Sequence, residues 1–136
     1  MGGSSSEKNV SVKTGNAVID SLSKKYPDIR PVNISFRDMQ FNFLDDISKG
    51  DIVFNALHGG SGENGDIQTI LEMSQILYTG SDSKASRVCM DKHLSKMIAK
   101  SEGLTVPNWI LCRNKNLSKT KLFNTVGEKF SYEARS

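Results

Sequence analysis

Three side chains in this sequence have the types and settings that suit chemistry: the carboxylate of Glu7, the imidazole of His58 and the ammonium of Lys92. His58 has the most telling setting, because it follows the apolar run Asp51–Leu57 and opens a loop with four glycines. Parallel strands deliver side chains into a crevice at their carboxyl ends, and glycines there let a ligand approach closely. A histidine can donate to a carboxylate or accept from an ammonium group, so the loop predicts a small-molecule site. Taken without its glycines, His58 could equally be a packed or solvent-facing residue.

Glu7 and Lys92 each have a simpler reading. Glu7 ends the loop Gly2–Ser6 and completes an S-x-x-E capping box with Ser4. A helix amino terminus of this kind can bind an anion, but the loop has neither the P-loop nor the dinucleotide-binding pattern. Alone, Glu7 is most simply a capping residue. Lys92 shares a helix face with Lys96 and is most simply part of a solvated stripe.

The elements that must position these residues alternate between strand and helix. A first helix is expected from the capping box to about Tyr26, with Val10, Ala17, Val18 and Leu22 on its inner side. The alternation predicts an α/β fold with a parallel sheet and right-handed crossovers. The later expected elements are strands at Val32–Phe36, Asp51–Leu57, Ile76–Thr79 and Val106–Leu111, and helices at Phe41–Ile47, at Ile67–Gln75 with Asp66 as N-cap, and at Ser81–Gly103, broken near Val88–Met90 with Gly103 as C′ residue.

Composition excludes several classes of function. A net charge of +3 over 136 residues, without a basic block, predicts no nucleic-acid partner. No apolar stretch approaches the roughly 18 residues that span a bilayer, so no membrane partner is expected. Cys89 and Cys112 read as isolated free thiols, and the two histidines are not spaced as metal ligands, so no metal site is assigned. The chain reads as cytoplasmic.

Both ends of the chain predict an incomplete polypeptide. A glycine-rich loop that opens a helix in an α/β fold normally follows a strand, and here Met1 already stands in that loop. The segment Phe123–Ser136 breaks off after another potential strand start. Marginal folding is therefore expected, because an absent strand leaves backbone groups and apolar surface exposed.

Five segments in order resemble the amino-terminal part of D-alanine–D-alanine ligase, an ATP-grasp enzyme, over about residues 1–110. The resemblance implies a Rossmann-like parallel sheet lacking its first strand at residues 1–87, followed by the start of the central ATP-grasp domain at residues 88–136. The matching segments are Met1–Ser11, Ala56–Gly59 with Gly62–Gln68, Tyr78–Ser81, Met90–Lys92 and Leu104–Pro107.

The resemblance also implies a reaction and site residues. ATP would phosphorylate the carboxylate of one D-alanine, and the amine of a second would attack the acyl phosphate to give D-alanyl-D-alanine for peptidoglycan synthesis. Glu7 would hold the ammonium of the first D-alanine, Val10 would line that subsite and His58 would contact the carboxylate. Lys92 would bind the phosphates of ATP as a point charge. The Mg²⁺ (or Mn²⁺) that the family uses has no assignable ligands here, and Lys129 is not taken as the family's second ATP-binding lysine.

Two other functions stay open for this polypeptide: a non-catalytic remnant, or a small-molecule binding module that uses the Glu7–His58 crevice without chemistry. The absence of assignable metal ligands predicts that the chain alone has no ligase activity and binds Mg·ATP weakly. The resemblance leaves a homodimer open, as well as the choice of D-alanine, D-lactate or D-serine as second substrate.

Overall fold

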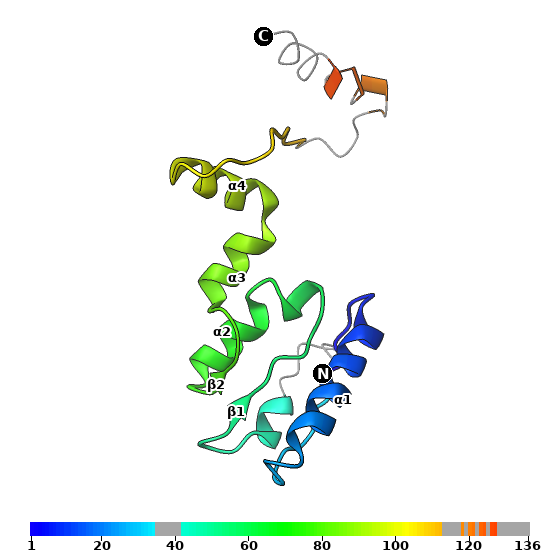
Figure 1. The fold of residues 1–136 in the computed structure, drawn as a ribbon, viewed down its shortest axis with the longest axis vertical. Helices are drawn as coiled ribbons and strands as arrows, with labels where there is room; N and C mark the ends of the chain where they lie inside the picture. The colour runs from blue at the N-terminus through cyan, green and yellow to red at the C-terminus, as the bar shows by residue number, and fades with distance from the viewer. Residues whose placement is uncertain (35–41, 113–117, 119, 122, 125, 128–136) are drawn as a thin grey trace. The chain divides into compact units, whose positions relative to one another are not determined.

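The fold is an α/β arrangement in which short parallel strands alternate with helices (Figure 1). This computed structural model describes residues 1–34, 42–112, 118, 120, 121, 123, 124, 126 and 127. The α/β class expected from the alternating pattern is therefore confirmed. The named elements are α1 (Lys8–Leu22), the 3₁₀ turn η2 (Asn42–Asp46), β1 (Ile52–Val53), the 3₁₀ turn η3 (Gly60–Gly62), α2 (Asp66–Met73), β2 (Leu77–Tyr78), α3 (Ser83–Met90) and α4 (Lys92–Ser101).

Backbone contacts divide the chain into two units, Met1–Ser95 and Lys96–Ser136. The domain boundary expected between residues 87 and 88 stays a prediction. The first unit contains both named strands and the core. In the second unit, α4 ends in a Schellman motif: Leu104 N donates to Ala99 O and Gly103 N donates to Lys100 O, with Gly103 at φ +77°. Gly103 is thus the C′ residue that the sequence predicted.

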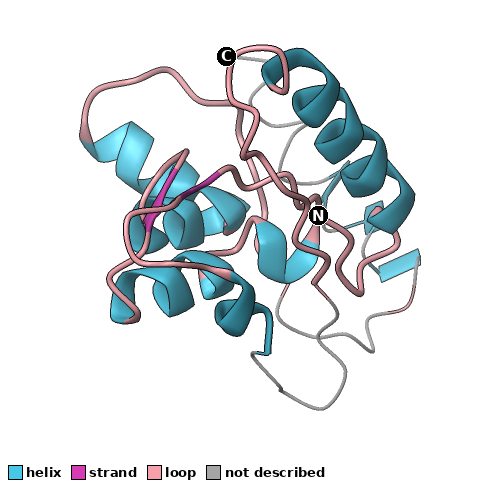
Figure 2. Cartoon of the chain, turned by 90° about the horizontal axis from the view of Figure 1, so that it is seen from below, coloured by secondary structure: helices cyan, strands magenta, loops and turns pink. Residues whose placement is uncertain are grey.

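The first unit contains a two-stranded parallel sheet and, apart from it, one parallel bridge. β1 pairs with β2 in the register Ile52 to Leu77 and Val53 to Tyr78. Separately, Gly2 forms a parallel bridge with Ile34, in which Ile34 N donates to Met1 O and Gly3 N donates to Ile34 O. Figure 2 shows how short the paired strands are beside the helices. The glycine loop that leads to α1 therefore does begin at the end of a paired backbone segment.

The run Asp51–Leu57, which was expected to form one strand, pairs as a strand over only part of its length. Only Ile52 and Val53 pair with a neighbour, because the following backbone groups have other partners. The Asn55 side chain accepts from Leu57 N, and the Ser11 hydroxyl donates to Ala56 O. A local side-chain bond of the Asn55 type competes with sheet pairing. The prediction placed the strand correctly in the sequence but overestimated the number of residues that pair with a neighbouring strand.

The hydrophobic core lies between α2, η2 and the end of the Asp51–Leu57 run. Its buried members are Phe43, Leu57, Ile67 and Leu71, and Leu71 is only 1% exposed. Partly buried hydrophobic side chains pack against this cluster: Val32, Ile34, Leu44, Ile47, Val53, Ile70, Ile76 and Tyr78. Because Leu57 belongs to this core and His58 follows it, core packing fixes the backbone that carries the imidazole.

Several expected boundaries were wrong for identifiable reasons. α1 begins at Lys8 with Glu7 as N-cap residue and no side-chain cap, because Ser5, not Ser4, accepts from Glu7 N. α1 ends at Leu22 rather than near Tyr26. The N-cap of α2 is Gly65 at φ +93°, so Asp66 is already helical and its N–H donates to the Asn64 side chain.

The inner face of α1 also differs from the prediction. Ser11 and Gly15 are its buried residues, whereas Val10 is 47% exposed and Ala17 is exposed. Gly15 is buried because the Met1 side chain packs where a Cβ would stand. Val18 and Leu22 are partly buried, as the helical pattern indicated.

In the second half of the chain the outcomes are mixed. β2 and the two-piece helix are confirmed, and the break falls at Asp91, whose backbone is extended. Residues 106–111 form no strand among the described residues, so that expectation was wrong. Residues 35, 36 and 41, and most of 123–136, lie outside the described residues.

Glu72 ties α2 to β2 and to the start of α3. Its carboxylate accepts from the Tyr78 hydroxyl at 2.6 Å, from Ser83 Oγ at 2.6 Å and from Ser83 N at 2.9 Å. The bonds from Ser83, then that from Tyr78, hold the pKa of Glu72 below its ordinary value of 4.5. Burial, and then the bond to Glu72, raise the pKa of Tyr78 from 10.0 to about 12.

These shifts predict a pH dependence of stability. Since the folded pKa of Glu72 is depressed, its stabilisation is present above pH 4.5 and is lost as the pH falls through the folded pKa. Since the folded pKa of Tyr78 is raised, its stabilisation is present below pH 10.0 and is lost as the pH approaches about 12. Urea midpoints of the wild type and of Glu72→Gln, measured across the acid range, should converge at low pH. A constant gap between the two curves would contradict this.

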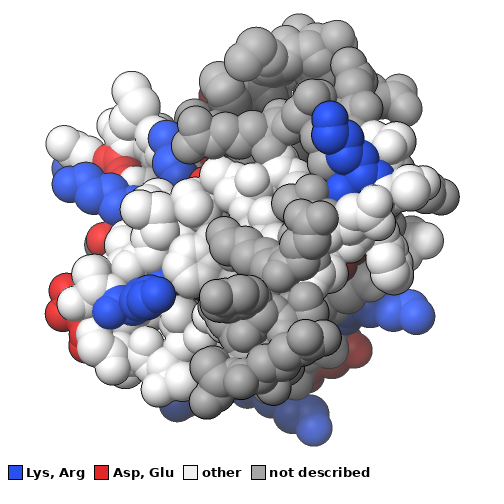
Figure 3. All heavy atoms as spheres, turned by 90° about the horizontal axis from the view of Figure 1, so that it is seen from above, with Lys and Arg blue, Asp and Glu red and all other residues white. Residues whose placement is uncertain are grey.

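Charged side chains do not gather into one patch on the face drawn in Figure 3. Lys and Arg side chains of the described residues stand apart there, with acidic side chains between some of them. Two ion pairs of the described residues join segments of the first unit: Arg30 with Asp51 at 2.5 Å, and Arg87 with Asp66 at 3.6 Å. Among the described helices, none is both long and apolar enough to cross a bilayer.

Candidate functional site

Two glycine-containing loops from distant parts of the sequence meet around one small hollow. The loop Gly3–Ser5 precedes α1, and the loop Leu57–Gly62 follows the strand run; together they line a cavity of about 110 Å³. Pockets for drug-sized ligands measure about 300–1,000 Å³, so this hollow suits a much smaller molecule.

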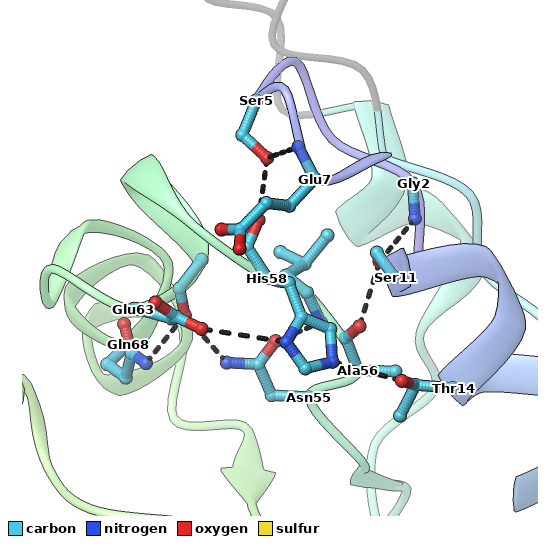
Figure 4. Close-up of polar contacts among 12 residues, drawn as sticks. Gly2, Ser5, Glu7, Ser11, Thr14, Asn55, Ala56, His58, Glu63 and Gln68 are labelled. Carbon is cyan, nitrogen blue, oxygen red and sulfur yellow. Dashed lines mark hydrogen bonds and ion pairs between the residues drawn. The ribbon is translucent and has the colours of Figure 1, made fainter. Parts of the chain in front are cut away.

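Ser5 holds the two loops together. Its hydroxyl donates to the His58 carbonyl at 2.6 Å and accepts from Glu7 N at 3.2 Å (Figure 4). One hydroxyl thus fixes the backbone of both predicted site residues, although Ser5 and His58 are 53 positions apart. Because the Ser5 hydroxyl makes both of these hydrogen bonds, it does not cap a backbone N–H group of α1.

The Glu7 carboxylate lies against the backbone of the His58 loop. A Cβ atom at Gly59, whose φ is +68°, would overlap Glu7 Oε2, so only glycine fits this approach. In Figure 4 the Glu7 carboxylate lies beside Ser5 and the backbone of His58, whereas the His58 ring points toward Thr14. Among the described residues the carboxylate has no hydrogen bond or ion pair, and Glu7 makes no cap bond to α1. An unpaired, solvent-reachable carboxylate beside a small hollow can bind a cation.

The His58 ring is contacted at both nitrogens. Nε2 lies 3.0 Å from Thr14 Oγ1 of α1, and Nδ1 lies 3.7 Å from Glu63 Oε1 (Figure 4). The first distance is a hydrogen bond and the second is too long for one. The side chain of His58 is 35% exposed, so a ligand can still reach the ring.

Two amide side chains form hydrogen bonds to the backbone of the loop Leu57–Gly62. The Gly62 carbonyl accepts from Asn55 Nδ2 at 3.0 Å and from Gln68 Nε2 at 3.1 Å. Gln68 is buried on α2, and its Oε1 atom has no hydrogen-bond partner among the described residues. Because α2 holds Gln68 and the core holds Leu57, the loop is anchored at both of its ends.

Comparisons with known proteins all point to one family. Residues 35–81 match the family described as D-ala D-ala ligase N-terminus. The D-alanine–D-alanine ligase of Fusobacterium nucleatum is 44% identical over 79% of this chain and 37% of its own length. That of Aquifex aeolicus is 39% identical over 96% of this chain and 42% of its own length.

A solved structure gives the same result in three dimensions. The Bacillus anthracis D-alanine–D-alanine ligase complexed with ATP superposes with a TM-score of 0.71 at 38% identity, over 91% of this chain and 42% of that chain. The chain belongs to the D-alanine–D-alanine ligase family. It matches the amino-terminal portion of these ligases and spans about two fifths of the length of the relatives named here.

The structure brings together two of the four residues that the ligase resemblance singles out. His58 lines the small hollow, whereas Glu7 is not one of the lining residues and lies next to it, against Gly59. Val10 lies one turn along α1 and is half exposed, but it does not line the hollow. Lys92 opens α4, is exposed and also lies outside the lining. The roles expected of these four residues stay predictions.

Sequence reasoning missed the hydroxyl and amide residues that hold the ligase loops in place. Ser5 and Thr14 bond to His58, which is 53 and 44 positions away, and Gln68 bonds to Gly62, six positions back; such contacts leave no periodic signal. Glu63 was not singled out from the sequence either, and its carboxylate faces the His58 ring. The described residues contain no group of three or more His, Cys, Asp or Glu side chains that could hold a metal ion.

Proposed function

We propose that this chain forms the subsite for the first D-alanine of an enzyme that joins two D-alanines with ATP, through an acyl phosphate, for peptidoglycan precursor synthesis. The observation that carries the proposal is that an uncompensated Glu7 carboxylate lies against Gly59, the residue after His58, next to a hollow of about 110 Å³ that His58 lines. A zwitterionic amino acid presents one ammonium and one carboxylate, which match these two groups. Relatives named as D-alanine–D-alanine ligases support the choice of amino acid.

Each residue has a role that its chemistry suits. Glu7 binds the substrate ammonium by a charge-assisted hydrogen bond. His58 donates an N–H to a carboxylate oxygen, which orients the other oxygen for attack on phosphorus. Val10, half exposed on α1, contacts the apolar side of the substrate. Lys92, exposed at the start of α4, attracts ATP phosphates as a point charge.

The reaction then needs mainly positioning and neutralisation of charge. The D-alanine carboxylate oxygen attacks the terminal phosphorus of ATP, the bond to ADP breaks, and an acyl phosphate forms. The amine of a second D-alanine attacks the acyl carbon, phosphate leaves, and the amine loses a proton. The described residues do not supply a metal cluster, so we assign no step to Mg²⁺ on this chain.

The test is binding of D-alanine to the wild type and to Glu7→Gln. A hydrogen bond to a charged group contributes about 1.5–3 kcal/mol, so we expect affinity to fall about 10- to 100-fold. Nuclear magnetic resonance titration of the ring and methyl signals measures it. Glu102→Gln, an exposed acidic position in the other unit, is the matched control and should bind as the wild type.

A second ligand sharpens the experiment. D-lactate keeps the carboxylate and methyl of D-alanine and lacks the ammonium, so the wild type should bind it weakly. Glu7→Gln should bind D-lactate and D-alanine about equally, because the interaction that separates them is gone. Equal loss of both ligands in the variant would show that Glu7 does not bind the ammonium, and the proposal would fail.

A further inference from the structure

Thr14 contacts His58 across 44 positions of sequence, from the second turn of α1. Figure 4 shows the imidazole between Thr14 on one side and Glu63 on the other. The Thr14 hydroxyl lies 3.0 Å from Nε2, and the Glu63 carboxylate lies 3.7 Å from Nδ1. Each nitrogen of the ring therefore has one defined neighbour.

The direction of the Thr14 bond follows from where its hydroxyl hydrogen can go. Hydroxyls on helices commonly donate to the carbonyl four residues earlier. Thr69 does so to Gly65 O at 2.7 Å, and Ser21 does so to Ala17 O at 2.7 Å. Thr14 makes no such bond among the described residues, and Nε2 is its hydroxyl's one recorded partner there. With no carbonyl partner four residues back, this hydroxyl is available to donate to Nε2, and that direction requires Nε2 to be the unprotonated nitrogen of the neutral ring.

The other nitrogen then carries the hydrogen. A protonated Nδ1 directs its N–H toward the negative Glu63 carboxylate, an arrangement that electrostatics favours. At 3.7 Å this N–H is not consumed by a hydrogen bond to Glu63, so a ligand oxygen can accept it.

We propose that Thr14 is a positioning residue that fixes the Nδ1–H tautomer and the orientation of His58, so that the ring offers a hydrogen-bond donor to a ligand carboxylate. The inference rests on the proposed function for the identity of that carboxylate, the one of the first D-alanine. Thr14 itself touches no substrate. Its effect on binding passes through the imidazole.

The tautomer can be measured directly on the full 136-residue chain. In ¹⁵N-labelled protein, the two ring nitrogens of each histidine are resolved by their couplings to ring protons, and His93→Gln assigns the remaining set to His58. At the high-pH plateau of a titration, we expect Nδ1 to be protonated in the wild type and in Thr14→Ser, which keeps the hydroxyl. Thr14→Val, of similar shape without the hydroxyl, should give a tautomer mixture or protonated Nε2.

Either of two results would overturn the inference: protonated Nε2 in the wild type, or an unchanged ring in Thr14→Val. The wild type and Thr14→Ser decide the matter even where Thr14→Val does not fold. For binding, loss of a neutral hydrogen bond is worth about 0.5–1.5 kcal/mol, so D-alanine affinity should fall about two- to tenfold in Thr14→Val and recover in Thr14→Ser.

The ring and binding measurements separate the two proposals. The expected tautomer pattern without D-alanine binding would support the positioning by Thr14 and overturn only the proposed function. D-alanine binding that depends on Glu7, together with a ring that Thr14→Val leaves unchanged, would do the reverse.

Discussion

Replacing Leu71 by alanine is expected to lower the free energy of unfolding by about 2–5 kcal/mol. Leu71 is 1% exposed on α2 and packs in the cluster that includes Phe43, Leu57 and Ile67. The change removes buried apolar contacts and leaves a cavity that the short strands and helices around it can only partly close. Urea denaturation, followed by circular dichroism, measures the loss as a shift of the midpoint.

Met73→Ala is the matched control for Leu71→Ala. Met73 lies on the same helix two positions further along, and it is 82% exposed. Its replacement should change stability by less than about 0.5 kcal/mol. If both variants lose the same stability, α2 does not bury the face that the structure shows. Because Leu57 shares the core with Leu71 and precedes His58, a partly unfolded Leu71→Ala should also lose D-alanine binding.

Elements whose ends are marked by a nearby glycine or capping residue could be predicted from the sequence. Gly103 marks the end of α4 because only glycine takes φ +77° without strain, and the hydrogen bonds of the Schellman motif follow from that. Gly80 and the N-cap residue Asp82, whose carboxylate accepts from Ala85 N at 2.7 Å, separate β2 from α3 in the same way. These signals lie within a few residues of the feature they determine.

Features that depend on distant partners could not be predicted. The sequence predicted Ser4 as the partner of Glu7 N, whereas Ser5 takes this place and is held there by its bond to His58 O, 53 positions away. The strand after Asp51 was expected to run to Leu57, but Asn55 and Ser11 bond its backbone instead. The apolar pattern of a strand in the sequence does not show that side chains will bond to its backbone in place of a neighbouring strand.

The ionisable residues of the candidate site could be predicted from the sequence, but the orientation of the His58 ring could not. Glu7 and His58 stand out because of the glycines around them; in the structure His58 lines the hollow and Glu7 lies against Gly59 next to it, and their roles stay predictions. Thr14 has no signal in the sequence, because a threonine within a helix is ordinary. Only the three-dimensional contact with Nε2 shows that α1, the helix that follows Glu7, also contacts the imidazole.

The second large effect is expected from Ser11→Ala. Ser11 is fully buried on α1; its hydroxyl donates to Ala56 O at 2.8 Å and accepts from Gly2 N at 2.9 Å. One hydroxyl thus joins the backbone that leads to His58 with the backbone that leads to Glu7. Alanine leaves both backbone groups buried without this partner, at a cost of about 1–3 kcal/mol for each. Urea denaturation measures the loss of stability.

The Ser11 result has a matched control and a consequence for the site. Ser21→Ala removes a hydroxyl from an exposed position of the same helix, where it donates to Ala17 O, and should be nearly neutral. Because Ser11 ties together the two segments that carry Glu7 and His58, its loss should weaken D-alanine binding even under conditions in which the variant is folded. A folded Ser11→Ala chain with unchanged stability and unchanged D-alanine affinity would show that the hydroxyl does not join the two segments, and that Glu7 and His58 are held in place by the core and by Ser5 alone.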